Sequence, residues 1–213
     1  MTVINYGPGG GTSGAKTLKI NAAASTTVSD DFNRANSNPL SGNWTTVPGA
    51  NNLQLLNDAV STTADNQYGT SAADAYWNAN TFSSDQGAQA TLLTTETGVY
   101  SGPIVRASSS TLTYYALNSN TTNNMYVLYK VLNGVETPIQ VVYQTPQIGD
   151  VIKIVAIGNT INGYVNGVLI ATQIDSDITG GSPGIECSQV NAATPTLDKW
   201  SGWSVVGAGT QPS

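Results

Sequence analysis

Residues 148 to 185 read IGDVIKIVAIGNTINGYVNGVLIATQIDSDITGGSPGI, and they contain the clearest strand and turn signals in the chain. Val151 to Ile157 carries β-branched residues on both alternating faces, which is typical of a strand inside a sheet that is covered on both sides or nearly so. Asn166-Gly167 supplies the two positive-φ positions that a tight hairpin needs between two apolar runs. The segment therefore predicts short strands separated by turns that the local sequence specifies.

Short runs of apolar residues, separated by turn-forming residues, also occur upstream. Ser83 to Leu93, Val99 to Ala107, Thr111 to Leu117 and Met125 to Leu132 each predict a strand, and the polar run Asn118 to Asn124 is interpreted as the connection between the last two. Met125 to Leu132 has apolar bulk on both faces and is expected to be internal. About a dozen such runs without a helical period predict an all-β chain, folded as a two-sheet antiparallel β-sandwich of jelly-roll type with almost no helix.

Several motifs carry a resemblance to a known superfamily. They are Gly149-Asp150 at the start of a strand, the Tyr164 to Gly167 hairpin, Gly180 to Ile185, and, nearer the ends, Asp30 to Ala35, Gly42 to Trp44 and Leu197 to Trp203. Together they resemble the concanavalin A-like lectin/glucanase superfamily, in its laminin-G-like branch of bacterial and phage type. The resemblance covers residues 28 to 206 and implies a concanavalin A-like sandwich. It implies no single activity, because this superfamily includes lectins, glycosidases, lyases and adhesive modules.

The domain organisation follows from the same boundaries. Residues 1 to 27 include GPGGGTSG and predict a flexible Gly-rich N-terminal arm, residues 28 to 206 form the sandwich, and residues 207 to 213 form a C-terminal tail. The arm has two interpretations: a disordered leader, or a segment that orders only against a neighbouring subunit of a larger assembly such as a virion.

Composition restricts the partners and the chemistry. Charged residues make up 9% of the chain, and 13 carboxylates outnumber 7 Lys plus Arg, which disfavours nucleic acid and anionic membranes and favours neutral polymers. The absence of histidine excludes a Ser-His-Asp triad and His-ligated zinc. No secretory signal peptide and no membrane-spanning stretch is visible, so we expect an extracellular protein trimmed of its signal, or a virion-associated one released by lysis.

The chain lacks the catalytic motif that the resemblance to glucanases would imply. The resemblance to glucanases implies a Glu-x-Asp-x-Glu strand, which the chain does not contain, and Glu96, Glu136 and Glu186 stand far apart in the sequence. Paired catalysis by such remote carboxylates stays open. The lyases of the superfamily use Arg, Gln, His and Tyr; Arg106 beside Tyr115 reproduces only part of that set.

Sugar binding needs less: an exposed aromatic ring to stack on a pyranose face, with a few polar partners for the hydroxyls. The candidate ligand-binding residues are Tyr76, Trp77, Tyr100, Arg106, Tyr115 and Tyr126. Tyr76 and Trp77 are the first choice for a stacking platform. Trp44, Trp200 and Trp203 are expected to be core residues.

A structural calcium ion is the remaining expectation. Relatives often hold one where the terminal strands meet, which implies Asp30 and Asp198 as ligands here; the alternative is that these carboxylates are solvated or cap turns. Asp65, Asp74, Asp175 and Asp177 are weaker candidates, because Asp in loops usually serves an Asx-turn.

These observations predict a non-catalytic jelly-roll module that binds a polysaccharide or glycan surface, or that serves as a structural or decoration protein of a larger assembly such as a phage particle. The alternative is a polysaccharide-cleaving enzyme, either a glycoside hydrolase or a lyase. Nucleic acid and membrane are not expected as partners.

Overall fold

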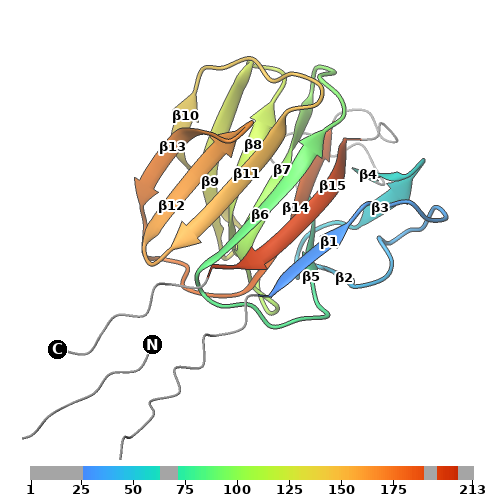
Figure 1. The fold of residues 1–213 in the computed structure, drawn as a ribbon, viewed down its shortest axis with the longest axis horizontal. Coiled ribbons are helices and arrows are strands. Elements are labelled where there is room, and N and C mark those ends of the chain that lie inside the picture. The colour runs from blue at the N-terminus through green and yellow to red at the C-terminus, as the bar shows by residue number, and fades with distance from the viewer. Residues whose placement is uncertain (1–25, 63–71, 190–195, 206–213) are drawn as a thin grey trace, which may run out of the picture.

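The computed structural model describes residues 26–62, 72–189 and 196–205. Within these ranges the regular elements are all β-strands, arranged as two antiparallel sheets that pack face to face (Figure 1). The predicted all-β, two-sheet jelly-roll sandwich is therefore confirmed. Positions 1–25 of the predicted arm and the predicted tail 207–213 lie outside the described residues. No helix in the described part of the chain is long and apolar enough to cross a membrane.

Sheet A is the front layer in Figure 1, and its strands pair in the order β13-β12-β11-β6-β15-β4-β3, with β1 pairing to β15. The strands of sheet A are β1 (Thr27–Asp30), β3 (Leu53–Leu56), β4 (Ala59–Thr62), β6 (Gln86–Leu92), β11 (Val151–Ile157), β12 (Thr160–Val165), β13 (Val168–Ile174) and β15 (Leu197–Ser204). The two ends of the described chain therefore meet within this sheet.

Sheet B lies behind it, and its strands pair in the order β10-β9-β8-β7-β14-β5-β2. The strands of sheet B are β2 (Trp44–Thr46), β5 (Ala73–Trp77), β7 (Val99–Ala107), β8 (Tyr114–Asn120), β9 (Met125–Leu132), β10 (Val135–Val142) and β14 (Ser182–Gln189). Strand β14 pairs with β5 on one side and β7 on the other, although it is far from both in the sequence.

The segment from residue 148 to 185 folds largely as predicted. Strand β11 lies between β12 and β6, so it is internal; its inward residues are buried, whereas Val151, Lys153 and Val155 are half-buried on the outer face of sheet A. The expectation that both of its faces are covered is thus met on one face only. Asn166 and Gly167 both have positive φ, 51° and 80°, as the hairpin requires. Strand β9 is internal as well, between β8 and β10.

One boundary was wrong. The polar run from Asn118 was interpreted as a connection, but β8 continues through Asn120. Asn118, Ser119 and Asn120 are buried and pair with Val127, Tyr126 and Met125 of β9. The low strand propensity of Asn is overridden by this pairing and by the hydrogen bond that the Asn118 Nδ2 amide donates to the Tyr129 hydroxyl oxygen, at 2.8 Å.

A group of three tryptophans joins the two sheets. Trp44 and Trp77 come from sheet B, and Trp200 comes from sheet A. The Trp77 and Trp200 rings are stacked with centroids 5.5 Å apart, and Trp44 meets Trp77 edge-on at the same separation. Each indole N–H has an acceptor: Asp30 for Trp44, Asn80 for Trp77 and the Gly184 carbonyl for Trp200. These rings are buried without leaving a donor unpaired.

We expect Trp77→Ala to destabilise the sandwich by about 3–5 kcal/mol, because it removes a large ring packed between two sheets and leaves a cavity. Urea denaturation followed by circular dichroism measures the loss. Trp203→Ala is the matched control, since Trp203 lies outside this group, and it should cost clearly less. A Trp77→Ala variant as stable as the parent chain would contradict the assignment of Trp77 to the core.

Candidate functional site

The outer face of sheet B contains a cavity of about 400 Å³. Side chains from β5, β14, β7, β8, β9 and β10 line it; the polar and aromatic ones are Asp74, Tyr100, Tyr114, Asn118, Asn120, Tyr129, Glu136, Glu186 and Ser188. One end is closed by a second apolar cluster that includes Val47, Ile104 and Val131, with Leu112 packed against it. The cavity therefore has an apolar end and a polar floor.

The floor follows one row of residues across the sheet. Glu186 of β14 lies directly opposite Asp74 of β5 and, on its other side, opposite Gly102 of β7. Gly102 has no room for a side chain, because an added Cβ would lie 2.0 Å from the Leu117 carbonyl oxygen and 2.8 Å from Asn118 Oδ1. The Leu117 carbonyl group and the Asn118 side chain therefore pack directly against Gly102, which only a glycine allows.

Two carboxyl groups are thus placed side by side with almost no exposure: Asp74 is 0% exposed and Glu186 is 3% exposed. The Tyr114 hydroxyl donates a hydrogen bond to Asp74 Oδ2 at 3.0 Å. The Tyr129 hydroxyl donates to Glu186 Oε2 and in turn accepts from Asn118. Each carboxyl group is therefore held in position by one tyrosine.

Burial dominates the electrostatics of this pair. It raises the pKa of Asp74 from its ordinary value of 3.8 to about 8, against the hydrogen bond from Tyr114, and the charge of Glu136 adds to the increase. Burial also raises the pKa of Glu186 well above its usual range, and the neighbouring Asp74 charge acts in the same direction. Two adjacent desolvated carboxylates repel each other, so the pair retains proton at neutral pH. Glu136 is exposed at the rim, where partial desolvation raises its pKa as well.

Two buried oxygen atoms in the floor of the cavity have no hydrogen-bond partner among the described residues: Asp74 Oδ1 and Asn118 Oδ1. Buried polar atoms are normally paired, by protein or by a bound molecule. A protonated Asp74 can donate from Oδ1, whereas Asn118 Oδ1 can accept. This combination suits a ligand rich in hydroxyl groups, since a hydroxyl both donates and accepts.

Of the six predicted ligand-binding residues, only Tyr100 lines the cavity, from the outer face of β7. Tyr76 is half-buried on the same sheet face but packs against the second apolar cluster. The stacking platform proposed for Trp77 was wrong, because its ring is 7% exposed and packed between the sheets. The strand period explains the difference: Tyr76 and Trp77 are adjacent, so they point to opposite faces.

Tyr115 and Tyr126 also point inward, and both are fully buried. The Tyr115 hydroxyl donates to Asp175 at 2.5 Å and accepts from the Ile178 amide, and Lys130 Nζ contacts the same carboxylate at 2.6 Å. The Tyr126 hydroxyl donates to Asp150 Oδ2 at 2.5 Å, beside the Asn166 hairpin. Both tyrosines anchor loops and cannot contact a ligand in the cavity.

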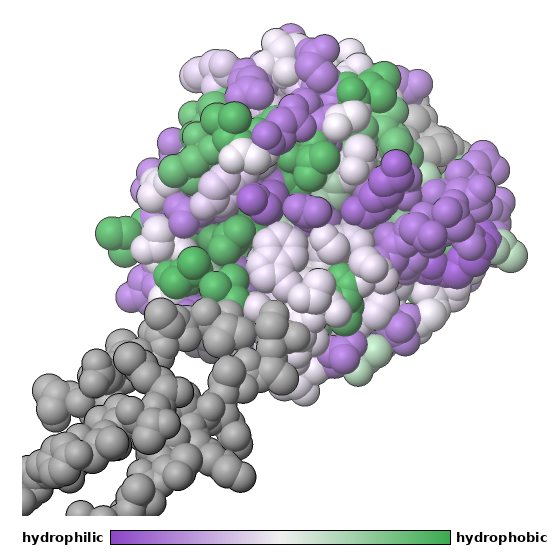
Figure 2. Space-filling model, in the orientation of Figure 1, coloured by the Kyte–Doolittle hydropathy of each residue, from purple (hydrophilic) through white to green (hydrophobic). Residues whose placement is uncertain are grey.

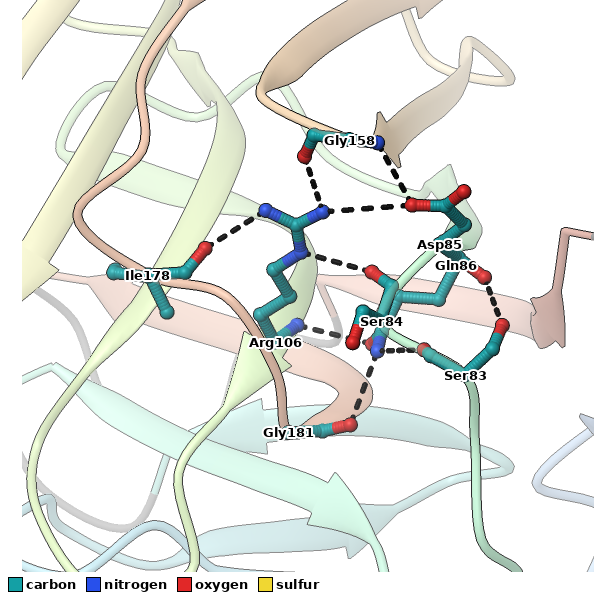
Figure 3. Close-up of polar contacts among 8 residues, drawn as sticks. All are labelled: Ser83, Ser84, Asp85, Gln86, Arg106, Gly158, Ile178 and Gly181. Carbon is teal, nitrogen blue, oxygen red and sulfur yellow. Dashed lines mark hydrogen bonds and ion pairs between the residues drawn. The ribbon is translucent and has the colours of Figure 1, made fainter. Parts of the chain in front are cut away.

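Arg106 is a structural residue as well (Figure 3). Its side chain is buried and donates hydrogen bonds to the carbonyl oxygens of Ser84, Gly158 and Ile178, at 2.9, 2.6 and 2.7 Å. Its backbone lies in the left-handed region, with φ of 57°, and its amide donates to Gln86 Oε1. Burial lowers the pKa of Arg106, but each of its three side-chain nitrogen atoms donates to a carbonyl oxygen, and the three carbonyl groups come from separate segments. The predicted ligand role of Arg106 was therefore wrong.

The two predicted metal ligands differ in their contacts. Strands β1 and β15 do pair, with Asp30 opposite Trp200, so the terminal strands meet as expected. Asp30 accepts from Arg34 at 2.6 Å and from the Trp44 indole, so an arginine already acts as its counter-ion. Asp198 is half-buried on β15 and accepts from the Lys199 amide.

No cluster of three acidic, cysteine or histidine side chains occurs within the described ranges. Among the weaker candidates, Asp175 and Asp177 contact Lys130, and Asp65 lies outside the described residues. Calcium binding stays a prediction.

Sequence reasoning missed Asp74 and Glu186 as a pair. Asp74 was considered only as a weak calcium ligand, and Glu186 only as an isolated glutamate. Their pairing depends on the register of β14 against β5, which no local motif reports. One weak signal existed: each carboxyl residue sits in a short run of small or apolar residues, ADA and IEC, where a charged side chain is unusual.

No family model matches the sequence, and no curated protein matches it. Solved structures match the fold. A prokaryotic β-1,3-1,4-glucanase (lichenase) derived from a mouse hindgut metagenome has a TM-score of 0.58 at 11% identity, over 84% of this chain and 99% of that one. The carbohydrate-binding module CBM66 from Bacillus subtilis has a TM-score of 0.56 at 16% identity, over 77% and 93%. The endo-β-1,3-glucanase from Pyrococcus furiosus has a TM-score of 0.56 at 12% identity, over 84% and 94%.

The fold is therefore that of the concanavalin A-like jelly roll, as the sequence motifs predicted. Known proteins that share it include both a carbohydrate-binding module and glucanases. At these identities the likeness shows the architecture and does not separate binding from catalysis.

The carboxyl pair predicts a pH-dependent stability. A raised pKa in the folded state means that the folded chain holds a proton that the unfolded chain releases, so the stability from Asp74 is fully present below pH 3.8 and is lost as pH rises through about 8. We expect the melting temperature to fall between about pH 5 and about pH 8, and to fall less in Asp74→Asn, which cannot titrate. Asp31→Asn, an exposed carboxyl outside the cavity, is the control. Equal falls in Asp74→Asn and the parent chain would refute the raised pKa.

Proposed function

We propose that this chain is a non-catalytic jelly-roll module that binds a neutral glycan in the cavity on the outer face of sheet B. The observation that carries the proposal is the floor of that cavity, where Asp74 Oδ1 and Asn118 Oδ1 are buried without a partner among the described residues. A sugar hydroxyl that reaches them restores the hydrogen bonds that burial has left unmade.

The surroundings support a sugar as the ligand. Tyr100 contributes a half-buried aromatic side chain to the wall, and its hydroxyl is fixed by Thr122 at 3.1 Å. Met125 and Val127 supply apolar surface for the carbon faces of a pyranose. Because the Asp74 and Glu186 pair retains proton at neutral pH, the floor carries less negative charge than its composition suggests, which suits an uncharged ligand.

A structural role in a larger assembly rests on the arm predicted for residues 1 to 27, nearly all of which lie outside the described residues. That role, together with the extracellular or virion-associated location, stays a prediction. The cavity supports glycan binding independently of where the chain resides.

The binding test uses an array of neutral and acidic oligosaccharides, followed by calorimetry on the best ligand. We expect Tyr100→Ala to weaken binding by roughly ten- to a hundredfold, because it removes an aromatic side chain from the cavity wall. Tyr143→Ala is the control: Tyr143 is an exposed tyrosine just after β10 that does not line the cavity, and its loss should leave affinity unchanged. Failure of the parent chain to bind any sugar on the array would overturn the proposal.

One observation favours the second candidate, a glycan-cleaving enzyme. Glu136 on β10 faces the same cavity as the buried pair and is close enough for its charge to raise the pKa of both Asp74 and Glu186. A glycosidase needs one protonated and one ionised carboxyl group on either side of the scissile bond. Here Asp74 and Glu186 lie on the same floor and both favour protonation, which argues against an opposed pair and leaves Glu136 as the group that would have to ionise.

The two candidates are separated by a reducing-sugar assay, with detection of unsaturated products, over neutral and acidic polysaccharides. We expect no turnover by the parent chain, while Glu186→Gln, which preserves shape, leaves glycan affinity within a few-fold. Turnover that disappears in both Glu186→Gln and Glu136→Gln would establish catalysis and reverse the ranking.

A further inference from the structure

We infer that the outer face of sheet A, around Trp203, is a second glycan-binding surface: a platform for an extended neutral polysaccharide. It lies on the opposite side of the sandwich from the cavity in sheet B and is independent of it.

Trp203 provides the aromatic ring of this platform. It was expected in the core, but it is half-buried, because it stands an odd number of residues after the inward-facing Trp200 and therefore points outward. Its register partner on β6 is Gly87. A Cβ added to Gly87 would lie 2.4 Å from Trp203 Cζ2 and 2.9 Å from Nε1, so the indole occupies the space above the glycine. The ring thus lies across the neighbouring strand, supported by backbone on one side.

The support is rigid. Strand β15 pairs with β1 on one side, where Thr27 is opposite Trp203, and with β6 on the other. On its inner side, Gly202 packs against the Trp200 ring, which belongs to the tryptophan group between the sheets. A ring on paired central strands loses little conformational entropy on binding, unlike a ring on a loop.

The surface around the ring carries few charged side chains. Gly87 is opposite Val155 of β11, and Val155 is in turn opposite Asn162 of β12. Gln89 lies two residues after Gly87 on β6 and points to the same face. Among the outward positions of β6, β11 and β12, Lys153 alone is charged, and its ammonium group lies over the Tyr164 ring at 4.2 Å from the centroid. Figure 2 views this face: a pale, weakly polar area lies between hydrophilic side chains on the β3 side and hydrophobic ones on the β12 and β13 side.

These properties define the ligand. The open face of an indole stacks on the C–H face of a pyranose, and the nearby amides of Gln89 and Asn162 suit sugar hydroxyls. Strand β15 adds one residue of each sign, Asp198 and Lys199, and the cation Lys153 is already placed over an aromatic ring, so this face does not suit a polyanion such as nucleic acid. Because the platform extends across four paired strands, β15, β6, β11 and β12, it suits an extended chain, or the surface of an insoluble polymer, better than a single sugar.

The test is a pull-down on microcrystalline cellulose and on crystalline chitin. We expect the parent chain to bind at least one of them, and Trp203→Leu to weaken that binding by roughly tenfold or more while still covering Gly87. Val155→Lys, which leaves the ring in place but puts a long charged side chain beside it, should weaken binding as well. Tyr100→Ala should bind the polymer like the parent chain, because its side chain lies in the cavity of the other sheet.

A spectroscopic measurement on the folded variants accompanies the pull-down. Trp44, Trp77 and Trp200 are buried, so acrylamide quenching of tryptophan fluorescence reports mainly on Trp203. Cellohexaose or chitohexaose should reduce the quenching of the parent chain and of Tyr100→Ala. The inference is overturned if neither polymer is bound, if Trp203→Leu or Val155→Lys binds like the parent chain, or if Tyr100→Ala alone abolishes binding. That last result would assign the polymer to the cavity, and it would leave the proposed function standing.

Discussion

The contact between the two sheets through Trp44, Trp77 and Trp200 is the constraint on which the rest of the structure depends. It fixes which face of β2, β5 and β15 points inward. Because successive residues of a strand point to opposite faces, it also fixes whether each neighbouring side chain points inward or outward. Asp74 and Tyr76 point outward because Trp77 points inward, and Trp203 points outward because Trp200 does. A shift of β5 by one residue would place Asp74 between the sheets and remove the carboxyl pair from the cavity.

Charged side chains hold the loops at the edges of the sandwich. Arg106 connects the carbonyl groups of Ser84, Gly158 and Ile178, and Lys130 contacts Asp175 and Asp177 from β9. The segment between β13 and β14 is therefore fixed by two strands of sheet B, β7 and β9. The hydrogen bonds that Lys130 donates to Asp175 and Asp177 raise the pKa of Lys130, so this contact persists across the neutral range. Removing such a buried or half-buried partner leaves polar groups unpaired, which costs more than the contact itself contributes.

Features that depend on neighbouring residues could be predicted from the sequence, whereas features that depend on residues far apart in the chain could not. The Asn166-Gly167 hairpin was predictable because the turn residues themselves adopt the required φ values, and the internal positions of β9 and β11 followed from apolar residues on both faces. The role of Arg106 was not predictable, because its partners come from three separate segments. Asp74 and Glu186 were missed for the same reason. Asn118 was misplaced because a polar run resembles a loop unless its strand partner is known.

Burial of the carboxyl pair costs the fold free energy. An apolar residue at either position would remove the cost of burying an acid beside another acid and would extend the second apolar cluster across the floor of the cavity. Buried titratable groups that weaken a fold, held in position by tyrosines and left with an unpartnered oxygen, are typical of sites that bind or transform a ligand. Arg106 makes the contrast clear: it is just as buried, but all of its side-chain nitrogen atoms have carbonyl partners, and it acts only in the fold. The unpaired oxygen atoms of Asp74 and Asn118 in the cavity, more than burial or residue type, are therefore the reason that we propose these residues, and not Arg106, as ligand-binding groups.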